Sequence, residues 1–306
     1  MTKLPPLLFE GVNKLRFTGG EPTISRQICN LIEFSRSISS IETIGITTNG
    51  IKLASKLDEL HKAGLTHVNI SLDTLEKHKF TKITRREDGF FMRVISAIYK
   101  SMEKGLKVKV NCVVIRGVND DEVAKFVDLT RDVPLDVRFI ELMPFDQNDW
   151  SSRKLVSYIE IIQRLKDTGV YLVKADKVKQ SNQLPHVSFP IIQDIHDPHD
   201  TTKWYRVEGS SAGSGRVGFI TSMSSHFCGS CNRLRITADG KLKVCLFGDE
   251  SFSLIDAMRK HEFDNNLLIR LINDVVKQKK AVLGGFMETP ESLSQKKNRP
   301  MILIGG

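Results

Sequence analysis

The 306-residue sequence lacks any apolar run that approaches the roughly 20 residues of a membrane-spanning helix, which argues against a helical membrane protein. It lacks a glycine-rich loop ending in Lys-Ser or Lys-Thr, so side chains must hold the phosphates of any bound nucleotide. Aromatic residues make up 7% of the chain and do not alternate with its basic runs, which disfavours a nucleic-acid-binding module. The five cysteines are too few for a disulfide framework. We therefore expect a soluble protein of a reducing compartment, with no membrane or nucleic-acid partner.

Positive charge is in excess, because 45 Lys and Arg residues face 36 Asp and Glu residues, for a net charge of +9. The basic residues are scattered, although KQKK (277–280) concentrates them near the C-terminal end. A solvated basic surface accounts for such a distribution, and an anionic ligand is the alternative.

Short apolar strands alternate with helix-length segments between residues 12 and 174. The alternation indicates βαβ units and an α/β fold, either a barrel or an open sheet covered by helices. Asn119 and Ser157 are predicted to begin helices, and Gly64 and Gly105 to end them. The predicted strands are 12–17, 41–46, 66–71, 107–114 and 135–142, and the predicted helices are 23–38, 52–63, 90–104 and 119–131.

Polar segments stand at the ends of four predicted strands: TGGEP (18–22), TTNG (47–50), SLDT (71–74) and ELMPF (141–145). The carboxyl ends of parallel strands meet at one end of the sheet, where ligands bind. The two glycines of TGGEP allow a ligand to approach the backbone, and Glu21 offers a carboxylate to an ammonium group. These segments predict a ligand mouth.

The alternation stops after residue 174. Residues 175–203 are predicted to be a loop, and HDPHD (196–200) to be surface rather than a metal site. The short strands RVGFITS (216–222), LRITAD (234–239) and KLKVCLF (241–247) are predicted to form a small antiparallel addition with a turn at ADGK (238–241). Helices are expected at about 252–260 and 264–280.

Three cysteines, Cys228, Cys231 and Cys245, form the strongest motif. A structural zinc site could be completed by His226. However, Arg233 and Arg235 would present two guanidinium groups on one face beside the metal, which suits a phosphorylated ligand. An iron–sulfur cluster with three thiolates and one open position fits this arrangement better than zinc, and both interpretations remain open at this point.

The sequence resembles the molybdenum-cofactor biosynthesis protein A family, whose members are radical S-adenosylmethionine enzymes that cyclise GTP. The resemblance extends from about residue 12 to 306. It rests on FTGGEPT, GITTNG, NISLDTL, KVNCVVIRGVND, DVRFIELMPF, FITSMSSHFCGSCNRLRITADGKLKVCLFG and RPMILIGG. It implies an incomplete (β/α)6 radical S-adenosylmethionine barrel over residues 1–174, a variable loop region over 175–215, and a C-terminal extension for the Fe–S cluster and GTP over 216–306.

The resemblance also implies site residues. A C-terminal [4Fe–4S] cluster would be held by Cys228, Cys231 and Cys245, with the guanine base at its fourth position. No catalytic residue is assigned. Contacts with GTP are implied for Arg16, Thr47, Lys109, Arg138, Arg233, Leu234 and Arg235. Contacts with S-adenosylmethionine are implied for Gly20, Glu21, Ser71 and Met143. The C-terminal Gly305 and Gly306 are implied to reach the active site.

The implied reaction begins with hydrogen abstraction from C3′ of the GTP ribose by a 5′-deoxyadenosyl radical. Bond formation to C8 of the base and reduction then give (8S)-3′,8-cyclo-7,8-dihydroguanosine 5′-triphosphate. Implied partners besides GTP are the next pathway enzyme, cyclic pyranopterin monophosphate synthase, and a second copy of the chain. The implied compartment is the cytoplasm in a bacterium or the mitochondrial matrix in a eukaryote.

The sequence departs from the family in one respect. It contains no Cys-x3-Cys-x2-Cys, the motif that holds the radical-initiating cluster. We therefore expect the first βα unit of the barrel, with the ligands of a second [4Fe–4S] cluster, to be missing, and this chain alone to lack radical initiation. The alternatives are a non-catalytic isoform that binds GTP and an Fe–S cluster, or a zinc-bearing nucleic-acid-binding module.

Overall fold

The computed structural model describes residues 11–175, 200–211, 213–225, 227–247, 250–260, 264–280, 290–294, 298 and 300–301. Its main feature is an eight-stranded sheet in the order β1-β2-β3-β4-β5-β8-β7-β6. Strands β1 to β5 and β8 run parallel to one another. At one edge of the sheet, β7 is antiparallel to β8, and β6 is antiparallel to β7. The strands are β1 (Lys14–Phe17), β2 (Thr43–Thr48), β3 (His67–Ser71), β4 (Lys107–Val114), β5 (Asp136–Glu141), β6 (Leu172–Lys174), β7 (Lys203–Val207) and β8 (Val217–Ile220). The predicted α/β class is confirmed.

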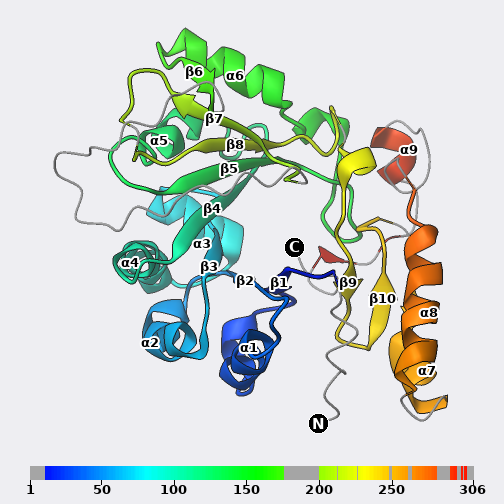
Figure 1. The fold of residues 1–306 in the computed structure, drawn as a ribbon. Coiled ribbons are helices and arrows are strands. Elements are labelled where there is room, and N and C mark those ends of the chain that lie inside the picture. The colour runs from blue at the N-terminus through cyan, green and yellow to red at the C-terminus, as the bar shows by residue number, and fades with distance from the viewer. Residues whose placement is uncertain are drawn as a thin grey trace.

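Helices alternate with the parallel strands. They are α1 (Ile28–Arg36), α2 (Leu53–Ala63), α3 (Lys77–Thr84), α4 (Gly89–Glu103), α5 (Val123–Asp128) and α6 (Tyr158–Asp167), with short 3-10 turns at Pro22–Ile24 and Ser152–Lys154. The sheet follows an arc in Figure 1, with α1, α2, α4 and α5 along its outer side.

Local sequence signals set several helix ends. The side chain of Ser157 accepts a hydrogen bond from the backbone N–H of Glu160 and caps α6, as predicted. Gly64 ends α2 at φ 110°, a left-handed conformation that glycine adopts without steric cost. The prediction for Asn119 is wrong, because α5 begins only at Val123 and the Asn119 side chain bonds other segments.

The core lies between the sheet and these helices. Alternate residues of each strand point to this side, and the row Ile46, Val68 and Val108 is in register and fully buried. Further along the strands, Phe139 and Phe219 are also register partners, with ring centroids 5.9 Å apart. The outer face of the sheet is therefore apolar, which leaves its opposite face available for other chemistry.

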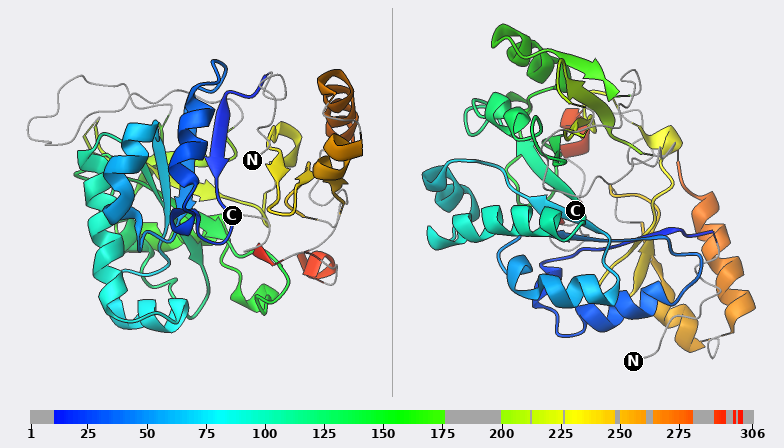
Figure 2. Two further views of the ribbon diagram at one scale, coloured as in Figure 1. Left: turned by 90° about the horizontal axis from the view of Figure 1, so that it is seen from below. Right: turned by 60° about the vertical axis from the view of Figure 1, so that its left-hand side comes forward.

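A smaller antiparallel sheet in the order β11-β10-β9 follows the large one. It consists of β9 (Arg235–Ile236), β10 (Lys241–Lys243) and β11 (Phe252–Ser253), and it is followed by α7 (Leu254–Lys260), α8 (Asn265–Lys277) and α9 (Pro290–Ser294). Figures 1 and 2 show β9, β10 and α8 on the side of the large sheet opposite α1 and α2.

One predicted strand belongs elsewhere. RVGFITS contains β8, which joins the large sheet parallel to β5 instead of the antiparallel addition. The predicted domain boundaries at residues 174 and 215 thus separate strands of one sheet, because β6 ends at the first boundary, β7 lies between the two and β8 follows the second. The division of the chain into three parts remains a prediction. No helix in the described ranges is long and apolar enough to cross a membrane.

Candidate functional site

Polar residues occupy every second position on the face of the large sheet opposite the core. Register partners on neighbouring strands point to the same side, so these residues form rows across the sheet. The first row is Arg16, Gly45, His67 and Lys107; the second is Thr47, Asn69, Lys109 and Asp136; the third is Ser71, Asn111, Arg138, Gly218 and Trp204. The sheet therefore has one apolar face and one charged face.

Cations from this face and from the Cys-rich segment influence one another. The pKa of Arg16 falls to about 10, because burial disfavours its charge and because Arg233 and Arg235 repel it, while Asp200 opposes the shift. The pKa of Arg138 falls to about 9 through burial, with repulsion by Arg16 and Arg233. Residues that are more than 200 positions apart in the sequence thus form one positively charged group.

Lys109 belongs to the same group. It is buried, with 8% of its surface exposed, and its Nζ lies 5.2 Å from the centre of the Trp204 ring. Burial and repulsion by Arg138 and Arg216 lower its pKa to about 7, against the attraction of Asp200. Arg216 packs on Trp204 at 4.1 Å, and the indole N–H of Trp204 donates to Asp200 at 2.7 Å. Both cations thus pack on one aromatic ring.

Neighbouring polar side chains orient the arginines. Oδ1 of Asn111 accepts hydrogen bonds from Nε and Nη2 of Arg138, at 2.9 and 2.7 Å. Nη2 of Arg233 donates to Oγ1 of Thr201 at 2.6 Å. In contrast, the buried Nε of Arg16 has no hydrogen-bond partner among the described residues. A buried donor of this kind costs free energy unless a ligand accepts from it, which fits an anion between these cations.

Thr47, another predicted GTP contact, is buried beside this group. Its Oγ1 accepts a hydrogen bond from Nδ2 of Asn69, its register partner on β3, at 3.4 Å. The structure thus brings together Arg16, Thr47, Lys109, Arg138, Arg233 and Arg235. Leu234 lies between the two arginines with 39% of its surface exposed.

Glu21 connects two of the predicted mouth segments. Its Oε1 accepts from the hydroxyls of Thr23 and Thr48, both at 2.6 Å, and from the backbone N–H of Thr23 at 3.0 Å. Its Oε2 accepts from the backbone N–H of Asn49 at 2.7 Å. The carboxylate therefore holds TGGEP against TTNG, and Oε2 retains a lone pair for a further donor. A side chain at Gly20 would meet open space, which matches a backbone that a ligand can approach.

The three cysteines lie near one another beside β9. Cys228 is in the 3-10 turn Cys228–Ser230, whose end is closed by a hydrogen bond from the backbone N–H of Cys231 to the Cys228 carbonyl. Burial raises the pKa of Cys228 to about 11, and Cys245 and Cys231 add to the shift. Burial also raises the pKa of Cys231, but the backbone N–H of Arg233 and the charge of Lys279 outweigh it, and the net pKa is lowered.

Lys279 connects the two segments that carry the cysteines. Its Nζ donates to the carbonyl oxygens of Arg233 at 2.8 Å and Val244 at 2.6 Å. The segment after Cys231 and the segment before Cys245 are thus held together by one cation from the end of α8. The apolar cluster of Phe145, Phe247, Met143, Leu246 and Cys245 attaches the motif to the end of β5. The predicted S-adenosylmethionine contact Met143 and the predicted cluster ligand Cys245 therefore pack against the same pair of aromatic rings.

The donor set fits an Fe–S cluster. Each cysteine of such a cluster binds its own iron, so the three sulfurs need not converge on one point. Within the ranges that the structure describes, no group of three or more His, Cys, Asp or Glu side chains converges as the ligands of a single metal ion do. His226, Gly305 and Gly306 lie outside the described residues, as do residues 196–199 of HDPHD.

Several residues of the site have no signal in the linear sequence. Asn111, Asp136, Thr201 and Trp204 join it through strand register and through folding of the segment after residue 199 onto the sheet. Asp136, for example, is fully buried and accepts from Nη2 of Arg216 at 2.8 Å. The alternation of polar and apolar residues along β4, in KVKVNCVV, and along β5, in DVRFIE, is a local pattern that could have indicated a charged inner face.

Two protein-family models match parts of the chain. Residues 7–130 match the model of the Radical SAM superfamily, and residues 172–283 match that of Molybdenum Cofactor Synthesis C. The chain is thus of the radical S-adenosylmethionine class. It is 45% identical over 298 residues to GTP 3′,8-cyclase, mitochondrial, of Arabidopsis thaliana, with 97% of this chain and 69% of the relative covered. It is 41% identical over 253 residues to GTP 3′,8-cyclase of Alkaliphilus oremlandii, covering 82% of this chain and 70% of the relative.

The chain belongs to the family of GTP 3′,8-cyclases and molybdenum cofactor biosynthesis protein 1. Molybdenum cofactor biosynthesis protein 1 of Dictyostelium discoideum is 47% identical over 300 residues, which are 96% of this chain and 43% of the relative. The chain thus spans less than half the length of that relative. The family resemblance predicted from the motifs is confirmed.

Proposed function

We propose that this chain binds GTP on the charged face of its large sheet, as part of a radical S-adenosylmethionine enzyme that cyclises GTP in molybdenum cofactor biosynthesis. The observation that carries the proposal is the group formed by Arg16, Lys109, Arg138, Arg233 and Arg235, in which the buried Nε of Arg16 lacks a partner among the described residues. A triphosphate supplies the negative charge and the acceptors that these donors require. The names of the relatives, GTP 3′,8-cyclase, support the same substrate and a bond between C3′ and C8.

Cys228, Cys231 and Cys245 would hold a [4Fe–4S] cluster. When bound, this group supplies an iron with an open position, to which the guanine base can bind. The residues of the chain do the rest: burial and repulsion by Arg233 lower the pKa of Arg235, while Cys231 and Cys245 oppose the shift, so Arg235 interacts both with the thiols and with another cation of the group. GTP whose base binds at the cysteines would therefore place its phosphates at the arginines. Such positioning lowers the entropic cost of bringing the two reacting carbons together.

S-adenosylmethionine would bind at the ends of β1, β3 and β5. Gly20 offers open backbone and Oε2 of Glu21 offers an acceptor for an ammonium group, while Ser71 is exposed at the end of its strand. Met143 packs near Cys245, so this site would lie next to the proposed cluster. No catalytic residue of this chain is assigned.

The finer architecture is also part of the proposal. The parallel strands β1 to β5 would belong to a (β/α)6 barrel whose first βα unit is not within this sequence, followed by the variable region 175–215 and the extension 216–306. Radical initiation would depend on a second cluster for which the 306 residues contain no Cys-x3-Cys-x2-Cys. A second copy of the chain and cyclic pyranopterin monophosphate synthase are proposed partners, and a reducing compartment, such as the mitochondrial matrix in a eukaryote, the proposed location.

The decisive experiment compares two ligands on anaerobically reconstituted protein. GTP should bind to the 306-residue chain, and guanosine should bind much more weakly, because it offers no phosphate to the cations. Iron and sulfide analysis on the same sample should detect the cluster. Equal affinity for GTP and guanosine would rule out the phosphate role, and stoichiometric zinc without iron would favour the alternative metal. Binding of GTP and iron without turnover, once a radical-initiating cluster is supplied, would favour the non-catalytic alternative.

A further inference from the structure

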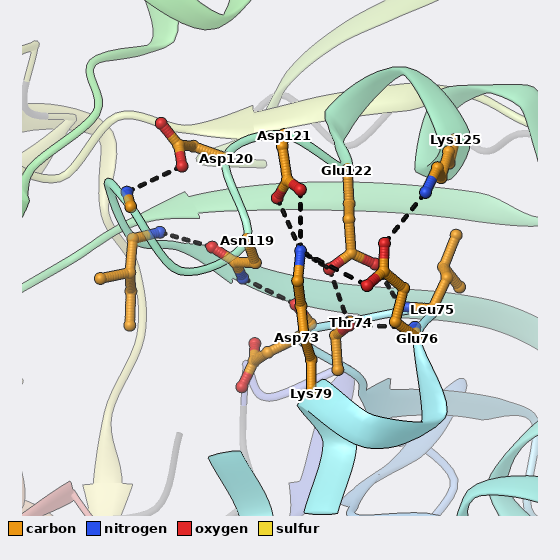
Figure 3. Close-up of polar contacts among 12 residues, drawn as sticks. Asp73, Thr74, Leu75, Glu76, Lys79, Asn119, Asp120, Asp121, Glu122 and Lys125 are labelled. Atoms are coloured by element: carbon orange, nitrogen blue, oxygen red, sulfur yellow. Dashed lines mark hydrogen bonds and ion pairs between the residues drawn. The ribbon is translucent and has the colours of Figure 1, made fainter. Parts of the chain in front are cut away.

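The loop that follows β3, residues 72–76, is held by a buried carboxylate from another segment. Glu122 is fully buried, with 0% of its surface exposed. Its Oε1 accepts from the hydroxyl of Thr74 at 2.7 Å, and its Oε2 from the backbone N–H of Leu75 at 2.7 Å. Lys79 of α3 donates to Oε1 at 3.1 Å. Figure 3 shows Glu122 pointing into this group from the start of α5.

Asn119 fixes the preceding part of the same loop. Its Nδ2 donates to the carbonyl oxygens of Asp73 at 2.7 Å and Val113 at 2.9 Å, and its Oδ1 accepts from the backbone N–H of Ile115 at 2.8 Å. The carbonyl of Asp73 faces Asn119, whereas its carboxylate points away from Asn119 and Glu122 (Figure 3), and its Oδ1 accepts from the backbone N–H of Val113 at 2.8 Å. The anchors thus determine which way the loop presents its side chains.

The acids around Lys79 differ in burial. Asp121 and Glu76 also pair with Lys79, at 2.8 and 3.7 Å, but their side chains are 64% and 41% exposed. Exposed pairs of this kind contribute little, since water screens them and holding them costs side-chain entropy. Glu122 is different, because its carboxylate is fully buried and accepts from the Thr74 hydroxyl and the Leu75 N–H, which would be left unpaired without it.

We infer that Glu122 is a positioning residue, which holds the β3 loop so that Ser71 is presented at the mouth of the sheet. Ser71 ends β3 and is exposed, and the loop begins at the next residue. The inference rests on the proposed function to the extent that Ser71 is a proposed contact of S-adenosylmethionine. The new element is that the affinity for S-adenosylmethionine depends on the Glu122 carboxylate. This carboxylate does not contact the ligand and acts through its hydrogen bonds with Thr74 and Leu75.

The test replaces Glu122 by Gln in the full-length protein. The glutamine amide keeps the shape of the side chain but brings an N–H2 group against donors that need an acceptor. Glu76→Gln is the matched control, because it removes one charge from the same group at an exposed position. Hydrogen exchange of peptides covering 71–76, binding of S-adenosylmethionine and binding of GTP are measured for each variant.

In Glu122→Gln, amide exchange in 71–76 should accelerate about tenfold and the affinity for S-adenosylmethionine should fall about tenfold, as expected from the loss of hydrogen bonds to a charged group. In the same variant, amide exchange near the cysteines and the affinity for GTP should stay within about twofold of the unmodified protein. In Glu76→Gln, all three measured quantities should stay within that range. A purely structural role would instead weaken both ligands together. If Glu122→Gln does not fold, the variant Thr74→Val is used in its place, because it removes one of the hydrogen bonds to Glu122 from the loop side.

Unchanged exchange in 71–76 would overturn the inference. So would faster exchange with unaltered affinity for S-adenosylmethionine. If the unmodified protein binds no S-adenosylmethionine, the proposed function of this end of the sheet fails, and the exchange measurement alone then decides whether Glu122 orders the loop.

Discussion

Asn111 and Arg138 are register partners on β4 and β5, and a single oxygen, Oδ1 of Asn111, accepts from two nitrogens of Arg138. The pair fixes the plane of a buried guanidinium. Among the described residues no acceptor meets the third nitrogen, Nη1, which leaves it for a ligand. Because this hydrogen-bond partner is neutral, the guanidinium of Arg138 keeps its positive charge available to an anion.

Replacement of Asn111 by Ala should therefore weaken GTP binding by about 1–1.5 kcal/mol, the value of hydrogen bonds that orient a charged group. Titration calorimetry with GTP measures the change. Asn30→Ala, an exposed asparagine on α1, serves as the control and should leave binding unaltered. Unchanged affinity in Asn111→Ala would mean that Arg138 does not contact the ligand or keeps its orientation without help.

Arg233→Ala and Arg235→Ala should each lower the affinity for GTP by roughly 1.5–3 kcal/mol, since each removes hydrogen bonds between charged groups. The weak affinity for guanosine should hardly change in either variant. Arg131→Ala, which removes an exposed cation paired with Asp128, is the matched control. The prediction fails if guanosine and GTP lose affinity equally, because the arginines would then support the fold and not the phosphates.

Cys231→Ser should abolish the cluster in the anaerobically reconstituted chain. The unmodified chain should hold about four irons, with the broad visible absorbance of an Fe–S cluster. Cys29→Ser changes a thiol on α1 that donates to Glu59, and it should retain the full iron content. Iron that persists in Cys231→Ser at the level of Cys29→Ser would exclude Cys231 as a ligand.

GTP binding should become weaker as the pH rises above 7. The pKa of Lys109 is about 7 in the free protein, chiefly because burial disfavours its charge. Phosphate must meet the charged form, so above pH 7 the neutral lysine has to take up a proton on binding, and the dissociation constant rises by up to about tenfold per pH unit. The γ-phosphate is already ionised there, because phosphate monoesters have a second pKa of about 6.

Calorimetry in buffers of different ionisation enthalpy, between pH 7.5 and 8.5, measures this proton uptake directly. Lys109→Arg keeps a charge whose ordinary pKa is above 12, so the uptake attributed to Lys109 should disappear in that variant. Binding without proton uptake in the unmodified protein would show that Lys109 does not titrate with the ligand.

Local sequence information was sufficient for the repeating units and for the family. The alternation of strands and helices predicted an α/β fold because burial of one apolar face imposes a periodicity on each element, as in α2 and β3. Ser157 and Gly64 marked helix ends because caps are local contacts. The residue types at the ends of β1, β2 and β3, and the spacing of Cys228 and Cys231, identified the family.

Tertiary structure alone decided which residues meet. RVGFITS has the local pattern of any short strand, and only the free edge of β5 determines that β8 pairs there in parallel. Asn119 has the composition of a helix cap, yet it bonds Asp73 and Val113 because two loops from distant parts of the chain meet at its side chain. Glu122 looks like a surface acid in DDEVAKF, and its burial results from packing of the α5 start against the β3 loop. Hydrogen-bond partners and strand register depend on contacts between segments far apart in the chain, for which a single sequence carries no local signal.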